Sequence, residues 1–85
     1  MIWDQKKNEW LKIYRQICFD DIAHILLDRK YLDILENPAR VGQLIFVLSF
    51  NNYTYVVPFI VDNQGQIILK TIYPSRKFHK QYGGK

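Results

Sequence analysis

The chain has 85 residues, of which 48% are hydrophobic and 15% aromatic, so it is long enough for one domain and too apolar to be intrinsically disordered. Its 12 Lys and Arg residues outnumber its 8 Asp and Glu residues, and the net charge of +4 favours a polyanionic partner such as nucleic acid. The single cysteine, Cys18, excludes an internal disulfide framework and a zinc site built from cysteines alone.

The start of the chain and its longest apolar run argue against export and membrane insertion. Asp4, Lys6 and Lys7 interrupt the region where a secretory signal needs an apolar segment. Residues 44–61 carry no charge, but two asparagines and a proline interrupt them and their alternation is typical of strands. We therefore expect a soluble cytoplasmic protein.

The first predicted helix follows residues 1–3, which are apolar and compatible with a very short strand. Asp4 is a suitable N-cap, because its side chain can accept a hydrogen bond from the first turn. We expect the helix to end near Arg15 or Gln16. Its apolar residues recur at the spacing of one helix face: Trp10, Ile13, Tyr14 and Ile17.

A second helix is predicted to start near Phe19. Asp20 and Asp21 would lie in its first turn, where the helix dipole favours negative charge. The apolar face of this helix is formed by Ile22, Ile25, Leu26 and Leu27. His24 lies within it, where we expect packing or solvent exposure rather than catalysis.

Three strands are predicted in the second half of the chain, at residues 44–50, 53–61 and 67–73. The Asn51-Asn52 pair between the first two is a two-residue hairpin signal, because asparagine tolerates positive φ. Pro58 cannot donate a backbone hydrogen bond, so its strand must have a bulge or an exposed edge there.

The remaining segments complete the predicted fold. A connector over residues 33–40 contains a turn, with a short extended piece near residues 32–35. Pro74 ends the third strand, and Ser75 can cap a short helix over residues 76–82. The element order predicts one α+β domain over residues 1–85, with two N-terminal helices, an antiparallel meander sheet of three or slightly more strands, and a short C-terminal helix.

Positive charge is concentrated in the last sixteen residues, 70–85. This segment has five Lys and Arg residues and no acid, whereas the rest of the chain has seven basic and eight acidic residues. Aromatic residues lie between the cations, which favours an ordered surface over a loose polybasic arm. A nucleic-acid-binding surface is one interpretation, and a solvated C-terminal helix without a ligand is the other.

The basic and phenolic groups of this segment suit metal-free cleavage of RNA. On a helix, Arg76, His79 and Lys80 would share one face, with Lys77 about 100° away. Arginine can stabilise the dianionic transition state, and Lys, His or Tyr can transfer the protons. The same groups would also suit phosphate binding alone, and the pattern leaves both open. No metal-binding motif and no Gly-rich phosphate loop is present, so we expect no metal and no cofactor.

Four segments of the chain carry a family resemblance. The first two are Trp3-Asp4-x-x-Lys7-Asn8 and Ile17-x-Phe19-Asp20-Asp21-Ile22. The other two are the hairpin, Ile45-Phe-Val-Leu with Tyr53-x-Tyr55-Val-Val-Pro-Phe59, and Leu69-Lys-Thr-Ile-x-Pro74-Ser75-Arg76-Lys77. Their order and spacing over nearly the whole chain resemble the BrnT-type toxins, small RelE-like ribonucleases of bacterial type II toxin–antitoxin systems.

The resemblance implies a RelE-like fold and metal-independent RNA cleavage that arrests translation. It also implies a cognate antitoxin with a ribbon–helix–helix or similar DNA-binding domain, a heterotetrameric complex, and contact with operator DNA only through the antitoxin. Arg76 and Lys77 match the family's basic residues after the last strand. Tyr14 and Arg15 fall where a Lys-His pair is common, and Gln16 replaces the usual glycine, so one acid–base candidate is missing.

Residues and resemblance together define a candidate site. We expect the C-terminal helix to pack over the sheet beside the first helix, which would bring Arg15 and Arg76 to one concave face. The candidate catalytic residues are Arg76, Lys77, Arg15 and His79. The candidate RNA-binding residues are Lys12, Lys80, Tyr73 and Tyr82. The alternatives are a nucleic-acid-binding module without catalysis and a protein-interaction domain whose basic segment docks an acidic partner.

Overall fold

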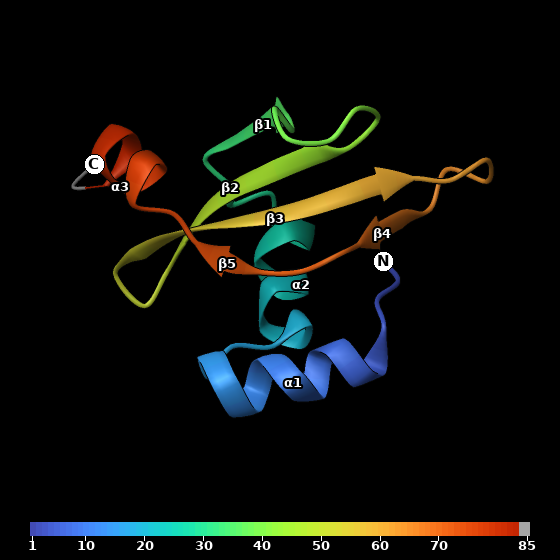
Figure 1. Ribbon diagram of the computed structural model, residues 1–85, viewed down its shortest axis with the longest axis horizontal. Helices are drawn as coiled ribbons and strands as arrows, with labels where there is room; N and C mark the ends of the chain where they lie inside the picture. Colours follow the sequence, from blue (N-terminus) through green and yellow to red (C-terminus); the bar gives the residue numbers. More distant parts are fainter. Residues whose placement is uncertain (84–85) are drawn as a thin grey trace.

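The computed structural model describes residues 1–83 and confirms the predicted α+β architecture (Figure 1). Gly84 and Lys85, the second of which belongs to the basic C-terminal segment, lie outside the described residues. The helices are α1 (Gln5–Arg15), α2 (Phe19–Leu27) and α3 (Arg76–Tyr82). The strands are β1 (Asp33–Glu36), β2 (Leu44–Phe50), β3 (Tyr53–Val61), β4 (Ile67–Leu69) and β5 (Tyr73–Pro74).

The sheet is an antiparallel meander in the order β1-β2-β3-β4, and β5 pairs with β3 beyond the end of β4. The β2–β3 hairpin has the predicted boundaries, and Asn51 and Asn52 take φ values of 51° and 63° at its turn. Two successive positive φ angles match the right-handed twist of the flanking strands. The short extended piece expected in the connector is the edge strand β1.

The predicted third strand, residues 67–73, is interrupted and forms two strands. Between the pairs Phe59↔Leu69 and Val56↔Tyr73, β3 has two residues (57 and 58) and the opposite segment has three (70 to 72). The extra residue lies in the segment opposite Pro58, whereas the sequence predicted a bulge or an exposed edge in the strand of Pro58 itself. The Pro58 carbonyl still accepts a hydrogen bond from the Lys70 amide, at 2.8 Å.

Alternate side chains of the sheet form two hydrophobic clusters on its two faces. The larger cluster joins α1 and α2 to the sheet through Leu11, Phe19, Ile22, Leu26, Phe46, Leu48, Val57 and Phe59, among others. The smaller cluster consists of Ile45, Val47 and Val56, and Phe78 and Tyr82 of α3 pack against it. The expectation that the C-terminal helix lies beside the first helix is therefore wrong, since Figure 1 shows α1 below the sheet and α3 above its left-hand end.

The predicted apolar face of α1 is largely exposed to solvent. Trp10, Ile13 and Tyr14 are 39%, 65% and 66% exposed, whereas Ile17, beyond the helix end, is buried. The side chains that α1 buries are Leu11 and Asn8. The periodicity therefore identified the helix but not its packed face, because the packed face includes a polar residue.

Asn8 is buried because its amide joins α1 to α2. Its Oδ1 accepts a hydrogen bond from the Phe19 amide at 2.7 Å, and its Nδ2 donates to Asp20 at 2.9 Å. The α2 N-cap residue, Cys18, makes no side-chain capping hydrogen bond, so Asn8 satisfies an N–H of the first turn of α2 from another helix. The hydrogen bond from Asn8 also lowers the pKa of the Asp20 carboxyl.

The turn between α1 and α2 begins at Gln16. This residue caps α1 in the left-handed conformation, with φ 50° and ψ 38°, which glycine adopts most easily.

We predict that Asn8→Ala lowers the free energy of unfolding by about 1–3 kcal/mol, because it leaves a buried amide of α2 without its acceptor. Urea denaturation followed by circular dichroism would measure the loss. Ile13→Ala, an exposed change on the same helix, is the control and should stay within about 0.5 kcal/mol of the wild type. Equal stability of the two variants would contradict the role of Asn8 as the joint between the helices.

Candidate nucleic-acid interface

The C-terminal helix α3 presents three cations to solvent and packs through its other side. Ser75 caps the helix, and its Oγ accepts a hydrogen bond from the Phe78 amide at 3.2 Å. Arg76, Lys77 and Lys80 are exposed. The predicted face of Arg76, His79 and Lys80 is therefore only partly realised, because His79 turns toward the sheet.

His79 anchors α3 to β3. Its Nδ1 lies 3.1 Å from the hydroxyl oxygen of Thr54, which is buried, and its ring stacks on Tyr53 with centroids 4.1 Å apart and planes 21° apart. These contacts occupy one ring nitrogen and one ring face. The described geometry thus gives His79 a packing role, and its predicted catalytic role stays a prediction.

Tyr82 links α3 to the edge strand β1. Its phenol donates a hydrogen bond to Oδ2 of Asp33 at 2.7 Å. That hydrogen bond is the main cause of a raised pKa for Tyr82, so the phenol remains protonated at neutral pH. Tyr82 was predicted to bind RNA, and in the structure its hydroxyl is engaged with a carboxylate.

Arg15 contacts the chain between β4 and β5 and not α3. Its guanidinium donates to the carbonyl of Ile72, which belongs to the bulged segment, and lies 4.9 Å from the centre of the Trp10 ring. Arg15 thereby holds α1 against the chain between β4 and β5. Because α1 and α3 pack on opposite faces of the sheet, the structure does not unite Arg15 and Arg76 in one cluster.

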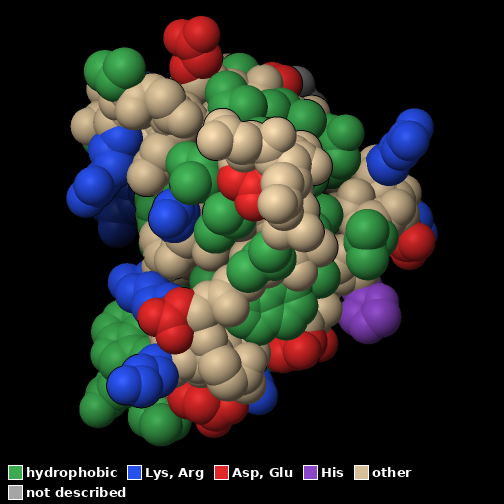
Figure 2. Space-filling view, turned by 90° about the vertical axis from the view of Figure 1, so that its right-hand side faces the viewer, with side chains coloured by type: hydrophobic (Ala, Val, Ile, Leu, Met, Phe, Trp, Pro, Cys, Tyr) green, Lys and Arg blue, Asp and Glu red, His purple; other side chains and the backbone are tan. Residues whose placement is uncertain are grey.

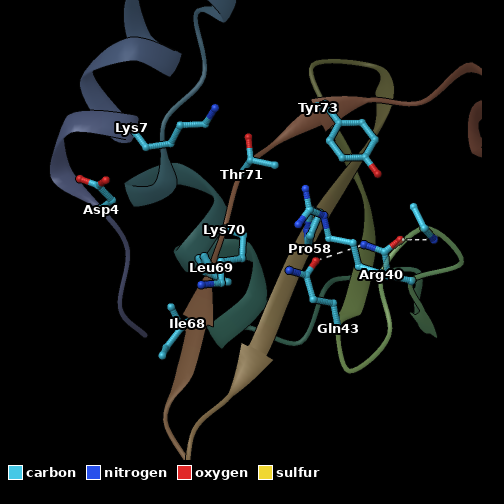
Figure 3. Close-up of a pocket in the computed structure, with 12 residues that line it drawn as sticks. Asp4, Lys7, Arg40, Gln43, Pro58, Ile68, Leu69, Lys70, Thr71 and Tyr73 are labelled. Carbon is cyan, nitrogen blue, oxygen red and sulfur yellow. Dashed lines mark hydrogen bonds between the residues drawn. The ribbon is translucent and has the colours of Figure 1, made fainter.

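A cleft of about 710 Å³ lies where the start of α1, the β1–β2 loop and the bulge opposite Pro58 meet (Figure 3). We call it the cationic cleft. Its positively charged lining residues are Lys7 from α1, Arg40 from the loop and Lys70 from the bulge. Amides and hydroxyls complete the polar lining: Asn37, Gln43, Thr71 and Tyr73.

The charge of the cationic cleft is poorly compensated. Its one carboxylate, Asp4, accepts a hydrogen bond from the Lys6 amide as the N-cap of α1. Within residues 1–83 the sole ion pair joins Lys12 to Glu9 at 3.4 Å, so Lys7, Arg40 and Lys70 have no carboxylate partner there. Figure 2 shows Lys and Arg side chains along the left side of the view, with Asp and Glu side chains among them toward the bottom. Such a cleft suits an anion, and phosphate in particular.

Tyr73 connects the cationic cleft with α3. Its side chain lines the cleft and also packs against the small cluster that α3 covers. The cleft and the exposed cations of α3 are therefore linked through one residue on the same face of the sheet. Of the eight predicted site residues, Tyr73 alone lines the cleft.

Sequence reasoning did not select Lys7, Arg40 or Lys70 as site residues. The sequence did carry a signal for Lys7 and Lys70, because both occur in the segments that resemble the toxin family. Arg40 had no such signal. It is placed by the β1–β2 loop, which is held by a hydrogen bond of 3.2 Å between Asn37 and Gln43.

Residues 1–83 contain no group of three or more His, Cys, Asp or Glu side chains arranged to hold a metal ion. Burial raises the pKa of the Cys18 thiol, which therefore stays protonated and is a poor nucleophile at neutral pH. None of the described helices has the length and apolar run needed to span a membrane.

Comparison of the chain with protein-family models, with curated proteins and with solved structures finds no match. The resemblance to BrnT-type toxins therefore stays a prediction from the quoted residues.

We predict that His79→Ala lowers the free energy of unfolding by about 1–2 kcal/mol, because it removes a stacked ring and leaves the buried Thr54 hydroxyl without its partner. Thermal denaturation would measure the effect. The neighbouring exposed change Lys80→Ala is the control and should melt as the wild type does. An unchanged melting temperature in His79→Ala would mean that His79 does not anchor α3.

Proposed function

We propose that this protein is a cytoplasmic toxin of a type II toxin–antitoxin system, a metal-independent endoribonuclease that holds RNA in the cationic cleft. The observation that carries the proposal is the grouping of Lys7, Arg40 and Lys70 in one cleft without carboxylate partners. In the proposed complex the cations bind successive phosphates, and the exposed α3 cations extend the path. The proposed partner is an antitoxin with a ribbon–helix–helix or similar DNA-binding domain, in a heterotetramer.

The proposed reaction needs a cation at the scissile phosphate and groups that move protons. Arg76 is the proposed cation for two reasons. It is exposed on α3, which packs against the same small cluster as Tyr73, a lining residue of the cleft. A guanidinium also stays charged while it contacts phosphate. The cleft itself contains Lys7, Lys70 and Tyr73 as groups able to transfer a proton. We assign proton transfer to this set, since His79 and Tyr82 are engaged in packing contacts.

A second candidate function is nucleic-acid binding without catalysis. The observation that favours it is that His79 is engaged in packing contacts and is therefore a poor candidate for proton transfer. The chain also lacks the Lys-His pair that is common in the resembled family. This alternative keeps the cationic cleft as the RNA-binding surface and omits cleavage.

We predict that Lys70→Gln and Arg40→Gln each weaken RNA binding. Each should also lower the slope of log Kd against the logarithm of the salt concentration by about 1, as expected when one phosphate contact is lost. Fluorescence anisotropy with a labelled RNA over a series of salt concentrations would measure both quantities. Lys30→Gln, an exposed lysine that does not line the cleft, is the matched control for net charge. If Lys30→Gln weakens binding as much as the cleft variants, the cleft is not the binding site.

We predict that the wild type cleaves total RNA in excess EDTA and that Arg76→Ala reduces the rate by about a hundred-fold or more, as for the loss of one transition-state contact. Gel analysis would follow cleavage, and thermal melting should show equal stability, because Arg76 is exposed. Intact RNA with folded wild-type protein, repeated in a ribosome-programmed translation assay, would reject the nuclease and leave the binding module.

A further inference from the structure

An aromatic pair lies on the exposed face of α1. The rings of Trp10 and Tyr14 are one helical turn apart, with centroids 5.2 Å apart and planes 40° apart. Tyr14 is 66% exposed, so most of its ring is open to solvent. The helix is packed on the sheet through Leu11, which is buried, so the fold does not require these two rings for its core.

Two cations lie over the Trp10 ring of this pair. The Lys7 ammonium lies 4.3 Å from the centre of the Trp10 ring, and the Arg15 guanidinium lies 4.9 Å from it. Lys7 also lines the cationic cleft, so the aromatic pair adjoins the cleft through this residue. Aromatic rings among cations beside a phosphate-binding groove are the combination with which proteins hold single-stranded nucleic acid.

The charge distribution selects the occupant of this face. A second copy of the chain would bring the same cations of Lys7 and Arg15 against each other, and an apolar partner would strip them of water. A polyanion that carries flat apolar groups can pair its negative charges with the cations and stack its apolar groups on the rings. Bases within a duplex are stacked on their neighbours and cannot reach the rings, whereas unpaired bases can.

We propose that Tyr14, packed against Trp10, stacks an unpaired base of single-stranded RNA whose phosphates lie in the cationic cleft. The inference rests on the proposed RNA binding and adds the class of RNA: single strands and loops rather than duplexes. Stacking on a π-face tolerates every base, so the platform sets the strandedness of the ligand and not its sequence.

The test compares three ligands of about 12 nucleotides: a single strand, the same strand in a duplex, and a sugar–phosphate strand without bases. Anisotropy would measure Kd for the wild type, Tyr14→Leu and Tyr14→Phe, with Ile13→Ala as control. Ile13 is 65% exposed on the same helix but has no ring. The wild type should prefer the single strand, and Tyr14→Leu should weaken that binding by about five-fold or more without affecting the strand that lacks bases.

Tyr14→Phe keeps the ring and should bind the single strand as the wild type does, as should Ile13→Ala. Equal loss in Tyr14→Phe and Tyr14→Leu would overturn stacking in favour of a contact by the phenol. Equal loss in Ile13→Ala would overturn stacking as well, because the loss would then not depend on an aromatic ring. Unchanged binding in Tyr14→Leu, with Lys70→Gln still weakened, would overturn the stacking proposal alone, whereas absence of RNA binding by the wild type would overturn the proposed function as well.

Discussion

The missing backbone donor of Pro58 is the constraint on which the arrangement of the cleft depends. Because Pro58 cannot complete the ladder, the last strand bulges opposite it and divides into β4 and β5. The bulge places Lys70 and Thr71 at the cleft and turns Ile72 into the core. It also frees the carbonyl of Ile72 from the ladder, and Arg15 binds that carbonyl. One proline therefore shapes the cleft and positions α1 beside it.

The attachment of α1 explains why its aromatic rings face outward. Asn8 supplies an acceptor for α2 and must lie at the helix–helix contact, so the buried face of α1 passes through Asn8 and Leu11. On a helix of 3.6 residues per turn, that choice turns Trp10 and Tyr14 away from the sheet. An apolar helix face thus remains at the surface in a small domain, which is a common sign of a binding site.

The features that were predictable from the sequence are those determined by local chemistry. The hairpin turn at Asn51-Asn52 and the caps at Asp4 and Ser75 each follow from what those residues can do within a few residues of the chain. Pro58 predicted an irregularity in pairing, but the extra residue lies in the opposite segment. The packed face of α1 and the sheet face covered by α3 depend on contacts between distant segments, and both predictions were wrong. For the same reason the cleft was missed, since Lys7, Arg40 and Lys70 meet only in the folded chain.

The contacts that hold the helices in place limit which residues could act on RNA in the proposed function. His79 and Tyr82 hold α3 in place, and Arg15 holds α1, so these three groups are tied to the fold. Recruiting any of them for proton transfer would loosen the helix that it anchors. Arg40 and Lys70 of the cleft anchor no helix in this way, and Lys7 touches both the cleft and the aromatic pair. In the proposed complex, phosphate binding and base stacking would therefore be coupled through Lys7 without a change in the fold.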